Sequence, residues 1–487
     1  MKEQITKMTV SRLSEGLSSK EISAVEAAKA YLDKITACDK EIGAYLQVTA
    51  EQALKQAQQV DQLRAAGERL SPLAGIPAGI KDNICAKGIN TTCASRMLEN
   101  FVPPYNAFVM QRLEERNVVM LGKLNMDEFA MGSTNENSYF KPVHNPRDLT
   151  RVPGGSSGGP AAAVAADEAA FTLGTDTGGS VRQPAAFCGI VGMKPTYGAV
   201  SRNGLVAFAS SLDQIGPLTK NVRDSALVME ALAAHDEADA TSLDYAWPSF
   251  TENLERGVKG LRIALPKEYF DDGVGVEIKD TVLAAASQYE KLGAKVEEVS
   301  MPTLGYALQV YCVIASAEAA SNLARFDGVK YGYRAQGCND IDEIYKVTRS
   351  KGLGREVKRR IMLGNLVLSS GYYDVYYKKA LQVRTLIVED FKRVFEGCDL
   401  ILSPVTPTTA HKLGEDGRDL IESYMGNFYT VAANIAGIPA LSLPCGEDSQ
   451  GLPIGMQLIG KRFDEPLLYQ AAYAYEQSNG TGKEDAK

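Results

Sequence analysis

A glycine-dense stretch in the first half of the chain limits its possible structures more than any other part of the sequence. Residues 151–204 contain 11 of the chain's 44 glycines, about twice the average density. Glycine at this density indicates close backbone approach or positive φ angles rather than side-chain packing. Two loops combine these glycines with serine: Gly154-Gly155-Ser156-Ser157-Gly158-Gly159 and Gly174-Thr175-Asp176-Thr177-Gly178-Gly179-Ser180. The stretch therefore predicts a site built largely from backbone.

The rest of the chain alternates between helical and strand-like segments. Ser23 and Glu26 fit a helix-capping box, and the apolar residues that follow recur on one helix face. Short apolar runs that end at Gly, Lys or Asp indicate buried strands. The pattern predicts helices over residues 1–66 and within 300–395, strands near 76–80 and 118–121, and strands and turns over 397–465. Alternation of this kind predicts an α/β fold.

Composition excludes several classes of function. The 487 residues include 52 basic and 60 acidic side chains, so a net charge of −8 argues against direct electrostatic binding of nucleic acid. No apolar leader or run of 18 apolar residues is visible, which predicts a soluble cytoplasmic protein. Eight scattered cysteines without a C-x-x-C pair favour reduced thiols. Only three histidines occur, and none lies in a zinc or Ser-His-Asp motif.

The two glycine loops allow three interpretations. A phosphate cradle is possible, but neither loop has the spacing or the lysine of a P-loop. A purely structural pair of turns explains the glycines but not the repeated serines. A serine nucleophile explains both, because a tight turn exposes Oγ and lines up backbone amides for an oxyanion.

A nucleophilic serine needs a base, and the scarcity of histidine points to lysine. Lys81 ends the apolar segment that begins at Leu73. Burial there would favour the neutral amine by lowering its pKa from about 10.4 toward roughly 7–8. On its own, a lysine at the end of a strand is more often a surface residue whose stem alone is buried.

Lys81 and the two loops together resemble the signature of the amidase signature family. The resemblance implies a Ser-Ser-Lys triad, in which Ser180 is the nucleophile, Ser156 the bridging serine and Lys81 the base. It further implies an oxyanion hole formed by the amides of Thr177, Gly178 and Gly179. We also expect a cis peptide between Gly155 and Ser156, because that serine must face both partners.

Segments outside the signature resemble the glutamine-hydrolysing subunits of tRNA-dependent amidotransferases, which belong to this family. They are Gly122–Thr134, Arg182–Cys188, Tyr331–Arg334 and Ser369–Asp374. By position, Met131, Tyr311 and Arg360 match the glutamine-binding residues, with Arg360 on the α-carboxylate. Asn427 stands where the family usually has the aspartate that pairs with the glutamine α-ammonium.

The resemblance also implies an architecture and partners. It implies one domain over 1–487, with a mixed sheet flanked by helices. This domain would consist of N-terminal helices (1–66), a core with the catalytic loops (67–235), a helical segment that lines the substrate pocket (300–395) and the C-terminal part of the core (396–470). The chain would need no metal or cofactor. It would join B and C subunits in a heterotrimer, and the partner subunit would bind most of the tRNA and use ATP and Mg²⁺.

Two other functions are compatible with the sequence. The first is a stand-alone amidase that acts on a small amide and needs no partner. The second is a non-catalytic scaffold subunit, for which Asn427 is the only supporting feature.

Overall fold

The computed structural model describes residues 2–271, 273–415 and 425–480. Its centre is an 11-stranded sheet in the order β1-β3-β2-β4-β6-β5-β10-β11-β9-β7-β8. The strands are β1 (Tyr45–Val48), β2 (Pro77–Lys81), β3 (Val119–Leu124), β4 (Phe171–Asp176), β5 (Val191–Lys194), β6 (Gln214–Thr219), β7 (Arg262–Pro266), β8 (Lys295–Val299), β9 (Leu400–Pro404), β10 (Ala440–Glu447) and β11 (Pro453–Gly460). The pairs β3–β2, β2–β4, β9–β7 and β7–β8 are parallel, whereas the edge pair β1–β3 and the pairs in the middle of the sheet are antiparallel. The predicted mixed α/β sheet is therefore confirmed.

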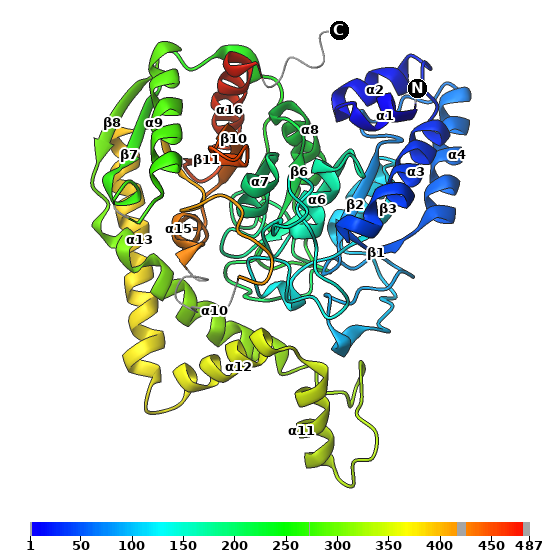
Figure 1. The fold of residues 1–487 in the computed structure, drawn as a ribbon, viewed down its shortest axis with the longest axis vertical. Coiled ribbons are helices and arrows are strands. Elements are labelled where there is room, and N and C mark those ends of the chain that lie inside the picture. Colours follow the sequence, from blue (N-terminus) through cyan, green and yellow to red (C-terminus); the bar gives the residue numbers. More distant parts are fainter. Residues whose placement is uncertain (1, 272, 416–424, 481–487) are drawn as a thin grey trace.

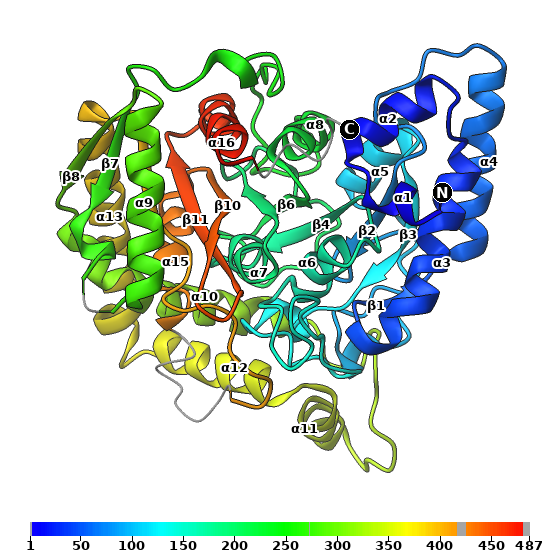
Figure 2. The same ribbon diagram turned by 45° about the horizontal axis from the view of Figure 1, so that its top comes forward.

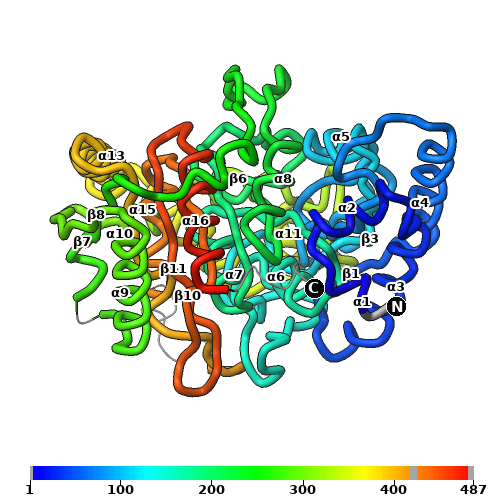
Figure 3. The backbone as a smooth tube through the Cα atoms, turned by 90° about the horizontal axis from the view of Figure 1, so that it is seen from above, coloured from blue at the N-terminus to red at the C-terminus, as the bar shows by residue number. Residues whose placement is uncertain are grey.

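Helices cover the sheet along its whole length. The helices that are described over at least six residues are α1 (Lys2–Lys7), α2 (Val10–Ser18), α3 (Ala24–Ile42), α4 (Ala50–Ala65), α5 (Phe108–Glu115), α6 (Gly158–Ala165), α7 (Arg182–Cys188), α8 (Val222–Leu232), α9 (Val276–Lys291), α10 (Ala307–Leu323), α11 (Ile341–Gly352), α12 (Arg355–Leu368), α13 (Lys378–Gly397), α15 (Phe428–Ala436) and α16 (Glu465–Asn479). Figure 3 shows α1 to α4 at one end of the molecule and β7 and β8 at the other.

The middle strands are buried on both faces. All residues of β2, β3, β4, β6, β9 and β11 are buried, whereas the edge strand β8 is largely exposed or half-buried. Helices α6 and α7 lie close to the centre of the sheet in Figure 2. Helix α6 begins within the first glycine loop, at Gly158, and α7 begins at Arg182, just after the second. All residues of both loops are buried, which leaves their backbone little freedom.

A group of helices lies to one side of the sheet. In Figure 1, α10 and α12 run below the sheet and α11 projects furthest from it. Helix α10 packs against α12, α13 and α15, so this group is joined to the core mainly through α10 and α15. It corresponds to the predicted helical segment 300–395.

Several local predictions are confirmed. The Ser23–Glu26 capping box opens α3, since the Glu26 amide donates to Ser23 Oγ at 3.1 Å and the Ser23 amide donates to Glu26 Oε2 at 2.9 Å. The apolar run near 76–80 forms β2, and the run near 118–121 forms β3.

Two local predictions are wrong. Residues 1–66 are not helical throughout, because β1 separates α3 from α4 and pairs with β3, a contact that no local pattern specifies. The tail is not only strands and turns, because α15 lies within it. This helix has nine residues and is buried from Tyr429 to Ile435, and so short a run of mostly apolar residues does not distinguish a buried helix from a buried strand.

Candidate active site

Lys81 is the last residue of β2, between β3 and β4, and its side chain is fully buried. Its Nζ donates at 2.8 Å to each of three hydroxyls, Ser156 Oγ, Ser157 Oγ and Thr175 Oγ1. Burial lowers the pKa of Lys81 to about 7, against the opposing effect of nearby carboxylates. The predicted base is thus held where its neutral form is accessible near neutral pH.

The first glycine loop brings Ser156 to Lys81. The peptide between Gly155 and Ser156 is cis, as expected from the sequence. A Cβ at Gly155 would lie 2.0 Å from Asp127 Oδ2 and 2.7 Å from the Thr134 amide nitrogen, so only glycine fits. The Asp127 amide in turn donates to the Ser156 carbonyl at 3.3 Å. The loop glycines therefore allow the backbone to pack closely enough to aim this serine inward.

The second glycine loop follows β4 and is organised by Asp176. Its carboxylate accepts hydrogen bonds from the Gly179 amide at 2.8 Å, from Arg182 Nε at 3.0 Å and from Asn434 Nδ2 at 2.8 Å. Burial alone would raise the pKa of Asp176, but the Arg182 guanidinium and these hydrogen bonds outweigh it and hold the pKa well below its ordinary value. An ionised carboxylate thus fixes the loop that carries Ser180.

The nucleophile candidate is the more accessible of the two serines. Ser180 is 9% exposed, whereas Ser156 is fully buried. Within the described parts of the chain, Ser180 Oγ makes no hydrogen bond, and the loop meets the other serines through the Ser157 amide, which donates to the Ser180 carbonyl at 3.2 Å. The proton-transfer step between Ser180 and Ser156 remains a prediction.

The three predicted oxyanion-hole amides differ in their surroundings. The Gly179 amide already donates to Asp176. Among residues 2–271, 273–415 and 425–480, the amides of Thr177 and Gly178 make no hydrogen bond. The Thr177 hydroxyl donates to Asp213 at 2.6 Å, and the Gly178 carbonyl accepts from Thr430 Oγ1 at 2.6 Å. The loop is fixed by these neighbours, and its Thr177 and Gly178 amides remain the candidates for an oxyanion.

Two of the predicted glutamine-binding residues lie against this loop. A Cβ at Gly178 would lie 2.6 Å from the Tyr311 ring, so α10 brings Tyr311 onto the loop. Asn427 directly precedes α15, and its carbonyl accepts from Thr430 Oγ1 at 3.1 Å. The same Thr430 hydroxyl lies 2.6 Å from the Gly178 carbonyl, which places the Asn427 backbone close to the loop.

The other two predicted glutamine-binding residues reach the site less directly. Met131 is fully buried after the short 3₁₀ turn η2 (Glu128–Ala130). Arg360 is 4% exposed on α12, where its Nε donates to Glu356 Oε1 at 2.7 Å. Its guanidinium lies 5.8 Å from the centre of the Phe208 ring. The roles of both residues in binding remain predictions.

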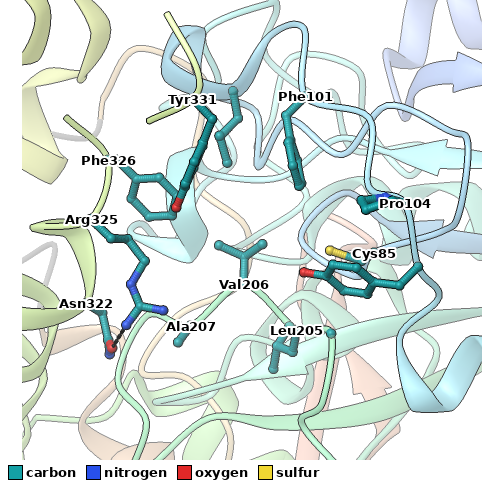
Figure 4. A pocket seen from close by; sticks show the side chains of 13 residues that line it. Cys85, Phe101, Pro104, Leu205, Val206, Ala207, Asn322, Arg325, Phe326 and Tyr331 are labelled. Atoms are coloured by element: carbon teal, nitrogen blue, oxygen red, sulfur yellow. Dashed lines mark hydrogen bonds between the residues drawn. The ribbon is translucent and has the colours of Figure 1, made fainter. Parts of the chain in front are cut away.

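A separate pocket of about 320 Å³ opens next to this region (Figure 4). Phe101, Tyr331, Val206 and Arg325 are among the residues that line it, and none of the ten predicted site residues does. Segment 206–208 contacts both regions, because Val206 lines the pocket while its amide donates to the Asn83 carbonyl at 2.9 Å, and Phe208 faces Arg360. The pocket is thus a neighbour of the candidate site rather than its centre.

Metal clusters and membrane-spanning helices are both absent from the described residues. These residues contain no group of three or more His, Cys, Asp or Glu side chains that could hold a metal ion. Their helices include none that is both long and apolar enough to cross a membrane.

Comparison with known proteins identifies the family. The family model described as Amidase matches residues 26–469. The chain belongs to the amidase family. The match spans both serine loops and Lys81, so the family resemblance seen in the sequence is confirmed.

Individual relatives are similar over nearly their full length. The chain is 59% identical to the A subunit of the glutamyl-tRNA(Gln) amidotransferase of Moorella thermoacetica, over 97% of this chain and 96% of that protein. It is 56% identical to the protein of the same name from Caldanaerobacter subterraneus subsp. tengcongensis, over 98% and 97%.

Solved structures agree with this relationship. The crystal structure of the glutamyl-tRNA(Gln) amidotransferase A subunit from Thermotoga maritima is 41% identical, with a TM-score of 0.81 over 97% of this chain and 95% of that one. The peptide amidase of Stenotrophomonas maltophilia is 30% identical, with a TM-score of 0.82 over 97% of each chain. The amidase-signature fold is therefore confirmed.

The buried acids around the site were not evident from the sequence. Asp127, Asp176 and Asp213 are almost fully inaccessible, and burial raises the pKa of Asp127 to about 7 and that of Asp213 to about 6. Each organises a loop next to a predicted catalytic residue. Their only sequence signal is an acid directly beside a glycine-rich or apolar segment, which is also common on surfaces.

Proposed function

We propose that this chain is the glutamine-hydrolysing subunit of a glutamyl-tRNA(Gln) amidotransferase. The observation that carries the proposal is the buried Lys81 with its pKa of about 7, hydrogen-bonded to Ser156, in a chain 59% identical to an A subunit of that enzyme. The chemistry required is hydrolysis of the glutamine side-chain amide to glutamate and ammonia.

In the proposed mechanism, Ser180 Oγ attacks the carboxamide carbon of glutamine. Its proton passes to Ser156, whose own proton passes to the neutral Lys81 amine. The oxyanion accepts hydrogen bonds from the free amides of the second loop. Collapse of the tetrahedral intermediate breaks the C–N bond, and the relay protonates the departing nitrogen, which leaves as ammonia. Water then hydrolyses the glutamyl ester and restores Ser180.

Substrate binding is assigned to the four pocket residues. Arg360 suits the α-carboxylate because a guanidinium can bind both oxygens at once. Tyr311 and Met131 would form apolar walls, and Asn427 would face the α-ammonium.

The ammonia must be used before it is lost to solvent, which supports assembly with B and C subunits. We place the ATP- and Mg²⁺-dependent amidation of tRNA-bound glutamate on the partner subunit, together with most tRNA contacts. The net charge of −8 on this chain supports that division, because a tRNA-binding surface is usually basic. We place the complex in the cytoplasm, where aminoacylated tRNA is used.

The test is to purify the chain together with its B and C subunits. We expect glutamine-dependent amidation of glutamyl-tRNA(Gln), with release of one glutamate per amide transferred. Hydrolysis of glutamine or other small amides by the isolated chain at the same rate would favour a stand-alone amidase. Amidation supported by ammonium but never by glutamine would favour a non-catalytic scaffold.

A further inference from the structure

Glu128 is a buried acid that the mechanism above does not use. It is 3% exposed and lies in η2, four residues after β3 ends. Its Oε1 accepts from Ser95 Oγ at 2.5 Å, and its Oε2 accepts from the Gly354 amide at 2.7 Å. Burial raises the pKa of Glu128 to about 7, although both hydrogen bonds and Lys358 oppose that effect. Burial of a carboxylate is energetically unfavourable unless its hydrogen bonds compensate for the lost hydration, so the role of these two contacts needs an explanation.

One end of the contact is the start of α12. Gly354 is the N-cap residue of α12, and its own residue type provides no side-chain cap. Glu128, 226 positions away in the chain, supplies a carboxylate there instead. Negative charge at a helix N-terminus is favourable because the backbone amides there lack partners within the helix. A Cβ at Gly354 would lie 2.2 Å from Glu128 Oε2, so the approach requires glycine.

Glu128 itself belongs to a segment that contacts the Ser156 loop. Residue 127 precedes Glu128 directly, and the Asp127 amide donates to the Ser156 carbonyl at 3.3 Å. On the other side, the Met131 amide donates to the Glu128 carbonyl at 3.0 Å. One short segment, 127–131, therefore touches the Ser156 loop, carries Met131 and holds the beginning of α12.

Helix α12 carries Arg360, six residues after the point that Glu128 holds. Helix α12 lies in the helical group on one side of the sheet, and α11 just before it projects away from the core (Figure 1). Without a fixed start, small shifts of α12 along its axis would move the Arg360 guanidinium relative to Ser180. The Glu128 contact ties this helix to the same segment that supports Ser156.

We propose that Glu128 is a positioning residue, which sets the place of α12, and so of Arg360, relative to the Ser156 loop. The inference rests on the proposed function, since it assumes that Arg360 binds the substrate carboxylate. Glu128 acts through Arg360 and does not touch the reacting atoms.

The main test is Glu128→Gln in the purified complex. The neutral amide removes the negative charge that faces the first amides of α12 and reverses the hydrogen bond to Ser95, whose hydroxyl must then accept from the NH₂ group. We expect the KM for glutamine to rise on the order of 10-fold with kcat changed less than about twofold, because Arg360 acts on binding. Hydrogen exchange of the amides at the start of α12 should become faster.

Two further variants sharpen the test. In Gly354→Ala the added methyl group displaces the Glu128 carboxylate from the Gly354 amide, so we expect the same rise in KM. The double variant Glu128→Gln/Gly354→Ala should show no further rise. Glu230→Gln is the matched control, because Glu230 likewise accepts from a serine hydroxyl, Ser249, and from the amides of Phe250 and Thr251, but on α8. It should leave the KM unchanged.

The outcomes separate this inference from the proposed function. An active wild-type complex whose KM is unchanged in both Glu128→Gln and Gly354→Ala would overturn the positioning role. Unchanged hydrogen exchange at the start of α12 in Glu128→Gln would overturn it as well, whatever the activity. A wild-type complex that never hydrolyses glutamine would refute the proposed function, while the exchange measurement would still decide whether Glu128 holds α12.

Discussion

Replacement of Lys81 by arginine tests the proton relay most directly. Arginine keeps the positive charge and the ability to donate hydrogen bonds, but it is not deprotonated at working pH. If Lys81 acted only as a charged hydrogen-bond donor to Ser156, Ser157 and Thr175, much of the activity should survive. If Lys81 must accept a proton, activity should nearly vanish.

The size of the effect follows from the lysine pKa of about 7. At pH 7.5 such an amine is neutral in roughly three-quarters of the molecules, whereas an ordinary arginine with a pKa above about 12 is neutral in far fewer than 1 in 100. We therefore expect kcat/KM for glutamine to fall by at least about 100-fold. In the unaltered chain the neutral form is the active one, so kcat/KM should rise about tenfold per pH unit up to about pH 7 and then level off.

The assay is glutamate release by the complex from pH 5.5 to 9. Lys194→Arg is the matched control. Lys194 is 1% exposed, burial also lowers its pKa to about 7, and among the described residues its Nζ donates only to the Pro195 carbonyl, at 2.8 Å. If both variants lose activity and thermal stability equally, the loss reflects the burial of a larger cation. Near-normal turnover in Lys81→Arg would refute the neutral-lysine mechanism.

Three other substitutions test separate parts of the site. Ser180→Ala should abolish glutamine-dependent amidation and acyl-enzyme formation while added ammonium still supports amidation; loss of both reactions in a folded complex would contradict this assignment. Asn427→Asp should lower the KM for glutamine several-fold with little change in kcat, because a charged acceptor adds on the order of 1 kcal/mol of binding to the α-ammonium; an unchanged KM would mean that residue 427 does not contact the substrate. Asp176→Asn should lower the free energy of unfolding by about 3–5 kcal/mol, because the buried Arg182 loses its counter-ion. A urea midpoint within error of the wild type would contradict this stabilising role of Asp176.

Much of the fold could be predicted from local patterns. The capping box at Ser23, the buried strand that ends at Lys81 and the helical character of 300–395 were all evident, because each depends on residues within a few positions of one another. The failures at β1 and α15 have one cause. The edge pairing of β1 and the all-round burial of α15 depend on neighbours that are distant in the chain.

The residue types of the proposed chemistry can be read from the sequence, because the serine loops, the scarcity of histidine and the lysine at the end of an apolar run together resemble the amidase signature. How those parts are held depends on contacts that appear only when the chain has folded. The links from Asp176 to Asn434 and from Glu128 to Gly354 join residues more than 200 positions apart. Such contacts leave no periodic or local signal, because a hydrogen bond needs only two groups brought together in space, and the intervening chain can have any pattern that folds.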